Sequence, residues 1–228
     1  MGLKAGIIGL PNVGKTTLFN ALTKGDALAA NYPFATIEPN KGVVNVFDSR
    51  LDFLTELYHP KKTTPTSFEF IDIAGLVKGA STGEGLGNQF LSHIRNVDAI
   101  CHVVRAFSDV NVTHVDGSVD PIRDISTINY ELSLSDEDIV IKRIQKIEKK
   151  ALTGDKEAAF ELNCLKKIKE CIDNLEDPKK LSFDKEEALL IKNYNLLTLK
   201  PVIYIFNILD SELSNLSSNK FYNQIVTY

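Results

Sequence analysis

Residues 9–16, Gly-Leu-Pro-Asn-Val-Gly-Lys-Thr, place the strongest constraint on what this chain can fold into. They fit the pattern G-x-x-x-x-G-K-[ST], in which a glycine-rich turn presents backbone N–H groups to phosphate oxygens. This motif requires a buried strand before it and a helix after it, because the helix N-terminus adds partial positive charge. The apolar run Leu3 to Leu10 comes first, and Lys15 to Lys24 follows with apolar residues at helical spacing. The sequence therefore predicts a strand, a phosphate-binding loop and a helix.

Further short apolar runs predict the rest of an α/β sheet. They are Phe68 to Ile73, Asp98 to Arg105 and Pro201 to Phe206. Runs of this kind are typical of strands buried on both faces of a parallel sheet. Helical stretches lie between them, so the expected fold is a P-loop, GTPase-like sheet flanked by helices.

The segment from about Asn129 onward has a different pattern, with dense charge and little glycine. Apolar residues recur at helical spacing up to Ala151 and again from Ala158 to Leu175, with Thr153-Gly154-Asp155 between the two runs. Asp155 is a candidate N-cap, and the second helix is expected to end at Glu176-Asp177-Pro178. We predict an antiparallel helical hairpin at 129–196, inserted into a nucleotide-binding domain formed by 1–128 and 197–228.

Composition excludes few classes of function. The net charge is −4, from 26 basic and 30 acidic residues, which does not favour nucleic acid or a membrane as a partner. No apolar run reaches the ~18 residues of a membrane span, and the start does not resemble a signal peptide. The three cysteines lack metal-site spacing and are expected to be reduced thiols. A cytoplasmic protein that does not enter the membrane is the expectation.

Asp72-Ile73-Ala74-Gly75, at the end of the second predicted strand, fits the D-x-x-G pattern. Downstream of a P-loop, such a motif supplies the second acidic group that phosphoryl transfer needs near its metal. Lys15 would then reach the β- and γ-phosphates, Thr16 and Asp72 would hold Mg²⁺, and the Gly75 N–H would contact the γ-phosphate. Thr36 is a candidate switch threonine that closes on the metal, or alternatively an ordinary residue of a surface loop.

Two positions depart from the Ras-type pattern. Leu76 follows Gly75 where those enzymes carry a water-positioning glutamine, so hydrolysis would need another group. The last predicted strand ends in Asn207-Ile208-Leu209-Asp210, with Ile208 in place of the lysine of the guanine-reading motif N-K-x-D. The glycine-rich segment 78–87 is a natural second switch. His114 lies in a polar loop after a strand, but its spacing alone does not single it out.

With these residues in view, the chain resembles the Obg-like ATPases of the YchF type over essentially its whole length. The most specific stretches are Gly9 to Thr17, Asn31 to Asn40, Asp72 to Gly87, His102 to Phe107, Gly117 to Asp124 and Leu197 to Pro201.

The resemblance implies a GTPase-like domain with an inserted coiled coil, followed by a TGS domain. It also implies a preference for ATP over GTP, association with the ribosome, and a role in translation or stress control. On this basis His114 stands in for the missing glutamine, and Asn12 is linked to assistance by K⁺ beside the Mg²⁺ cofactor. The expected sites are catalytic (His114, Lys15, Asn12), nucleotide-binding (Asn12, Val13, Gly14, Lys15, Thr16, Thr17, Gly75, Asn207, Ile208, Leu209, Asp210) and metal-binding (Thr16, Thr36, Asp72).

Two differences from the family pattern bear on these expectations. Asp210 stands where the family usually has glutamate, which restores part of a guanine reader. The sequence stops at Tyr228, before the last strand and the TGS domain expected of the family, so we expect reduced stability. A monomer is expected. The function expected is slow ATP hydrolysis. The alternatives left open are a GTP-specific GTPase and a nucleotide-gated binding module in which hydrolysis is dispensable.

Overall fold

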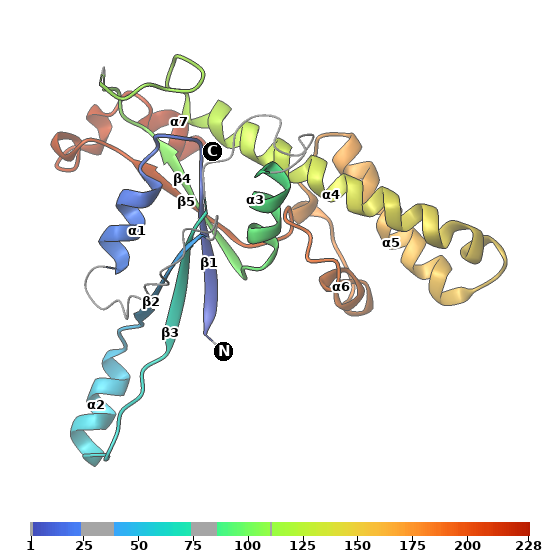
Figure 1. The fold of residues 1–228 in the computed structure, drawn as a ribbon, viewed down its shortest axis with the longest axis horizontal. Coiled ribbons are helices and arrows are strands. Elements are labelled where there is room, and N and C mark those ends of the chain that lie inside the picture. The colour runs from blue at the N-terminus through green and yellow to red at the C-terminus, as the bar shows by residue number, and fades with distance from the viewer. Residues whose placement is uncertain (1, 24–38, 74–85, 110) are drawn as a thin grey trace. The chain divides into compact units, whose positions relative to one another are not determined.

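The computed structural model describes residues 2–23, 39–73, 86–109 and 111–228. The chain divides into two compact units, each built from separate stretches of sequence (Figure 1). Unit 1 comprises Met1–Gly75, Val97–Val119 and Val202–Asn219, and unit 2 comprises Leu76–Asn96, Asp120–Pro201 and Lys220–Tyr228. The predicted domain boundaries at 129 and 196 stay a prediction.

Unit 1 contains a five-stranded sheet with the order β2-β3-β1-β4-β5. The strands are β1 (Leu3–Ile8), β2 (Asn40–Asn45), β3 (Ser67–Asp72), β4 (Ala99–Arg105) and β5 (Val202–Asn207). The central strands are parallel to one another, whereas β2 runs antiparallel to β3. Ile7, Ile8 and Ile100 are fully buried, as expected for strands covered on both faces. The α/β class and the four predicted strands are confirmed.

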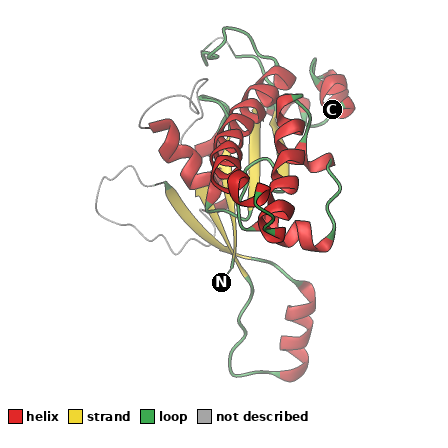
Figure 2. Cartoon of the chain, turned by 90° about the vertical axis from the view of Figure 1, so that its right-hand side faces the viewer, coloured by secondary structure: helices red, strands yellow, loops and turns green. Residues whose placement is uncertain are grey.

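Strand β2 and the helix after it were not predicted. β2 lies at the sheet edge and mostly exposes polar residues, and its apolar side chains are limited to Val43 and Val44, so its sequence does not resemble that of a buried strand. Helix α2 (Ser49–Tyr58) begins after Asp48, whose carboxylate accepts a hydrogen bond from the Arg50 N–H, and it buries no residue. It lies in the connection between β2 and β3 and stands away from the strands (Figures 1 and 2).

Helix α1 (Lys15–Thr23) starts within the P-loop motif and packs against β3 and β2. Phe19 and Thr23 are buried, and a Cβ placed on Gly42 of β2 would approach the Thr23 methyl group to 2.2 Å. Glycine at this position therefore permits close packing of α1 on the edge strand.

Unit 2 is helical, with α3 (Leu86–Arg95), α4 (Pro121–Leu152), α5 (Lys156–Asp173), α6 (Lys185–Lys192) and α7 (Tyr222–Thr227). Helices α4 and α5 pack against each other and confirm the predicted hairpin. Asp155 caps α5 by accepting from the Ala158 N–H, as predicted. The hairpin core contains most of the residues that the periodicity singled out, including Ile147, Leu162, Leu165, Ile168 and Ile172.

Two details of the hairpin differ from the prediction. Helix α4 begins at Pro121, with Asp120 as its N-cap, well before Asn129. Helix α5 ends at Asp173, and Leu175 has φ of 57° and is exposed, so Leu175 does not belong to the buried face. The left-handed backbone at Leu175 ends the helix before Pro178 is reached.

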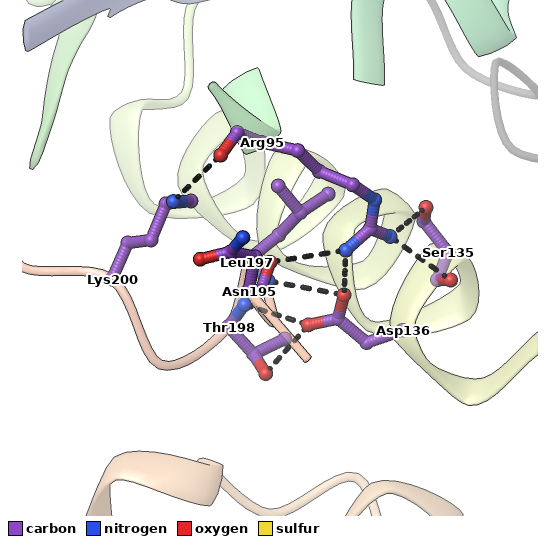
Figure 3. A network of polar contacts seen from close by, with 7 residues as sticks. All are labelled: Arg95, Ser135, Asp136, Asn195, Leu197, Thr198 and Lys200. Atoms are coloured by element: carbon purple, nitrogen blue, oxygen red, sulfur yellow. Dashed lines mark hydrogen bonds and ion pairs between the residues drawn. The ribbon is translucent and has the colours of Figure 1, made fainter. Parts of the chain in front are cut away.

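A buried carboxylate ties three segments of unit 2 together (Figure 3). Asp136 of α4 is fully buried and accepts hydrogen bonds from the N–H groups of Leu197 and Thr198 and from the Thr198 hydroxyl. It also forms an ion pair of 3.0 Å with Arg95, the last residue of α3. Arg95 in turn donates to Ser135 and to the Asn195 carbonyl. Asp136 therefore has several donors to offset the cost of burying its charge.

All three cysteines are buried free thiols, one in unit 1 and two in unit 2. Burial is the main cause that raises the pKa of Cys101, Cys164 and Cys171. Among the described residues, no helix combines the length and apolar character needed to cross a membrane.

Candidate nucleotide site

The loop between β1 and α1 has the backbone that its sequence requires. Gly9 and Gly14 have φ of 155° and 99°, and Asn12 has φ of 61°, in the left-handed region that asparagine tolerates. A Cβ on Gly9 would come within 2.4 Å of the Val103 carbonyl oxygen, and one on Gly14 within 2.5 Å of Asn207 Nδ2. The glycines therefore let this loop run close to β4 and to the end of β5.

Lys15 is buried in the loop, and its ammonium donates a 2.8 Å hydrogen bond to the carbonyl oxygen of Leu10. Burial lowers the pKa of Lys15, and the nearby Asp72 carboxylate partly offsets this effect. The Leu10 carbonyl offers the Lys15 ammonium only a partial negative charge. A phosphate bound in the loop would offer it a full negative charge.

Thr16 and Asp72, the predicted metal residues, come together although they belong to different motifs. The Thr16 hydroxyl donates to Asp72 Oδ2 across 2.9 Å. Thr16 lies in the first turn of α1, and Asp72 ends β3, so the parallel pairing of β1 with β3 brings the two residues close together. A hydroxyl and a carboxylate oxygen form the kind of hard ligand set that Mg²⁺ prefers, so these residues fit that ion.

Several predicted site residues cannot be placed. Thr36, Gly75 and Leu76 lie outside the described residues, as does most of the glycine-rich segment 78–87. Their assigned roles stay predictions.

Asn207, at the end of β5, faces the phosphate loop. Its side-chain Nδ2 donates to the Val13 carbonyl oxygen across 3.0 Å. With the nitrogen used in this way, the amide oxygen is the atom suited to accept a hydrogen bond from an adenine amino group. Ile208 and Leu209 follow in the turn, and Asp210 begins a short 3₁₀ helix (Asp210–Glu212) with its side chain exposed.

His114 is 7% exposed and lies in the loop that follows β4. Asn12 Nδ2 donates to the carbonyl oxygen of Thr113 across 3.3 Å, so this loop contacts the phosphate loop directly. His114 Nδ1 accepts a hydrogen bond from the Asp116 N–H. In a neutral imidazole this bond places the proton on Nε2.

His102, which the sequence suggested was structural, is 2% exposed on β4, with its ring 5.4 Å from that of Tyr204. Burial lowers the pKa of His102 to about 3. It is a neutral core residue at ordinary pH and is not part of the site.

Arg105 is the residue that sequence reasoning missed. It is the last residue of β4 and is 2% exposed, and its guanidinium contacts the same loop that carries His114. The signal available in the sequence was an arginine at the end of an otherwise apolar strand, immediately before a polar loop.

Comparison with known proteins agrees with this geometry. Residues 4–208 match the family model described as 50S ribosome-binding GTPase. The chain is 57% identical over 228 residues to the ribosome-binding ATPase YchF of Bacillus subtilis, covering 100% of this chain and 62% of that relative. It is 52% identical over 225 residues to the protein of the same name from Escherichia coli O157:H7, covering 99% and 61% of the two chains.

The solved structure of the Schizosaccharomyces pombe YchF GTPase has a TM-score of 0.80 and 43% identity, covering 99% of this chain and 61% of that one. The chain thus spans about three fifths of the length of these relatives. It belongs to the 50S ribosome-binding GTPase family and, within it, to the Obg-like group of the YchF type.

Proposed function

We propose that this chain is the nucleotide-binding and hydrolysing part of a ribosome-associated ATPase that works in the cytoplasm. The observation that carries the proposal is the Thr16–Asp72 contact, which joins the P-loop to the D-x-x-G motif at one point. The names of its relatives, ribosome-binding ATPase, point to the same substrate and partner.

In the proposed reaction, water attacks the γ-phosphorus in line and the bond to the β-phosphate oxygen breaks. Lys15 leaves the Leu10 carbonyl and binds the phosphates, together with the N–H groups of the loop around Gly14. Thr16, Asp72 and Thr36 would hold Mg²⁺, which would neutralise charge on the phosphate oxygens. Asn12 is the residue through which K⁺ would act.

We assign His114 to the attacking water as a hydrogen-bond donor. Because Nδ1 accepts from the Asp116 N–H, a neutral ring carries its proton on Nε2, and in the proposed role this Nε2–H would orient the water through its oxygen without removing its proton. In this role His114 positions the water, as the glutamine of Ras-type enzymes does at the position that Leu76 occupies here. Turnover is then expected to be slow, at about 10⁻⁴ to 10⁻² s⁻¹ without an activator.

ATP is favoured over GTP because Ile208 cannot supply the lysine stem of the guanine reader, while the Asn207 oxygen suits an adenine amino group. Titration calorimetry with ATP and GTP, in the presence of Mg²⁺ and K⁺, tests this preference. Tighter binding of ATP is expected. Tighter binding of GTP would mean that Asp210 reads guanine and that the chain is a GTPase.

His114→Ala tests the catalytic assignment. We expect kcat for ATP to fall at least about tenfold with little change in affinity, since orientation is lost and phosphate contacts remain. The matched control is His59→Asn, which replaces an exposed histidine of left-handed backbone at the end of α2. Equal kcat in the parent and His114→Ala would remove His114 from the mechanism.

Ribosome binding in the presence of ATP or a non-hydrolysable analogue separates an ATPase cycle from a nucleotide-gated module. Release of the chain from ribosomes only after hydrolysis is expected. Equal release with the analogue would favour the gated module.

A further inference from the structure

The guanidinium of Arg105 is bound to three backbone carbonyls of one loop. Nε donates to Phe107 O at 3.1 Å, Nη1 to Val112 O at 3.0 Å and Nη2 to Asp109 O at 3.3 Å. The guanidinium carbon also lies 4.5 Å from the centre of the Phe107 ring. One side chain therefore binds the backbone at Phe107, near the start of the loop, and at Val112, close to His114.

Burying a guanidinium is costly unless its donors are satisfied. Within the described part of the chain, Arg105 forms no ion pair, and its guanidinium contacts Phe107, Asp109 and Val112, all in the loop that follows β4. Lysine could not make the same contacts, because a single ammonium lacks the planar fork that reaches three carbonyls at once. The charge thus has a specific effect, which is to fix the path of this loop.

The fixed loop leads directly to the proposed catalytic histidine. Val112 is held by Arg105, Thr113 is held by Asn12 of the phosphate loop, and His114 follows. The start of the loop is also anchored, because the Ala106 N–H donates to the Asn207 carbonyl oxygen and Asn219 donates to the Ala106 carbonyl oxygen. Contacts therefore link the end of β5, the phosphate loop and the His114 loop to one another.

We propose that Arg105 is a positioning residue for hydrolysis, which holds the backbone at Phe107, Asp109 and Val112 so that His114 is presented beside the phosphate loop. This inference rests on the proposed function of His114. Arg105 itself need not touch the nucleotide. Its effect reaches the reaction through the backbone of Val112 and Thr113.

The test is Arg105→Lys, which keeps the charge and removes the fork. We expect kcat for ATP to fall about 10- to 100-fold, the loss typical of a catalytic group displaced by about 1 Å, while the Kd for ATP changes less than about threefold. In the His114→Ala background the same substitution should lower kcat by less than about twofold. A merely structural effect would lower kcat equally in both backgrounds.

A second readout does not depend on turnover. Hydrogen exchange of the Val112, Thr113 and His114 amides should speed up in Arg105→Lys, while exchange in β1 and β4 stays unchanged. Arg95→Lys is the matched control, because it makes the same chemical change at an arginine that also binds backbone carbonyls, Ser135 O and Asn195 O. It should leave exchange in the His114 loop as it is in the parent.

If Arg105→Lys does not fold, as judged by circular dichroism, Phe107→Leu replaces it. This variant removes the ring beneath the guanidinium and keeps the three carbonyl contacts, so a smaller loss of kcat, about three- to tenfold, is expected. Normal kcat in a folded Arg105→Lys or, where that variant does not fold, in Phe107→Leu overturns the inference while leaving the role of His114 intact. Normal kcat in His114→Ala overturns both.

Discussion

Arg105 in unit 1 and Asp136 in unit 2 are both buried charges, but they are anchored in different ways. Arg105 donates to carbonyls that lie two to seven residues away in the sequence. Asp136 is bound to Arg95, Leu197 and Thr198, which are 41 to 62 residues away. Contacts between distant segments offset a large loss of chain entropy, whereas local contacts select one conformation of a loop. We therefore expect Asp136 to contribute mainly to the stability of the fold and Arg105 mainly to the conformation of the loop that carries His114.

Asp136→Ala should have the largest effect on stability. It leaves Arg95 without its carboxylate and the N–H groups of Leu197 and Thr198 without an acceptor. We expect a loss of about 3–5 kcal/mol in the free energy of unfolding, measured by urea denaturation. Asp136→Asn, which keeps one acceptor oxygen, should lose less. If Arg105→Lys destabilises the protein as much as Asp136→Ala, the distinction between the two charges is wrong.

His102 lies three residues before Arg105 on the same strand and is also buried, but in its neutral form, unlike Arg105 and Asp136. Its pKa is about 3 in the folded protein and near 6.5 when unfolded. Between these values the unfolded chain binds a proton that the folded chain does not, so stability is complete above pH 6.5 and falls as pH decreases. From pH 7 to pH 5 the expected loss is about 2 kcal/mol.

Urea denaturation of His102→Gln at the two pH values checks this prediction. The variant should lose most of the pH dependence in that range, and the exposed-histidine variant His59→Asn should keep it. An unchanged slope in His102→Gln would show that another group is responsible.

The smallest effect is expected at Asp120, a partly exposed carboxylate that also accepts a backbone N–H. It caps α4 by accepting from the Arg123 N–H across 3.1 Å. Asp120→Ala should cost about 1 kcal/mol and Asp120→Ser much less, because serine also caps helices. Thermal denaturation measures both. A loss as large as that of Asp136→Ala would mean that burial and long-range contacts do not explain the difference between these carboxylates.

The parts of the fold that repeat a local pattern were predictable. The P-loop, α1 and the hairpin follow from motif and periodicity, and the Asp155 cap follows from residue type. Strand β2 was not predicted, because as an edge strand it has only Val43 and Val44 as apolar side chains among polar residues. Helix α2 was not predicted either, because its apolar residues, such as Phe53 and Leu57, are exposed and mark no buried face.

The site was predictable only in part, for a physical reason. Lys15, Thr16 and Asp72 are fixed by motifs, and the structure brings the last two into contact. The contact of Asn12 with Thr113 joins residues 101 positions apart, and no local pattern encodes such a contact. For the same reason spacing did not single out His114, and the contribution of Arg105 emerges only once the loop around it is seen.

The buried thiols give each unit its own reporter of transient opening. Cys101 lies in unit 1, whereas Cys164 and Cys171 lie in unit 2, and a buried thiol of raised pKa resists alkylation while its surroundings stay closed. The rate at which an alkylating reagent modifies each cysteine therefore measures how often that unit exposes its interior. Mass spectrometry of the labelled peptides would show whether nucleotide binding slows the transient opening of one unit or of both.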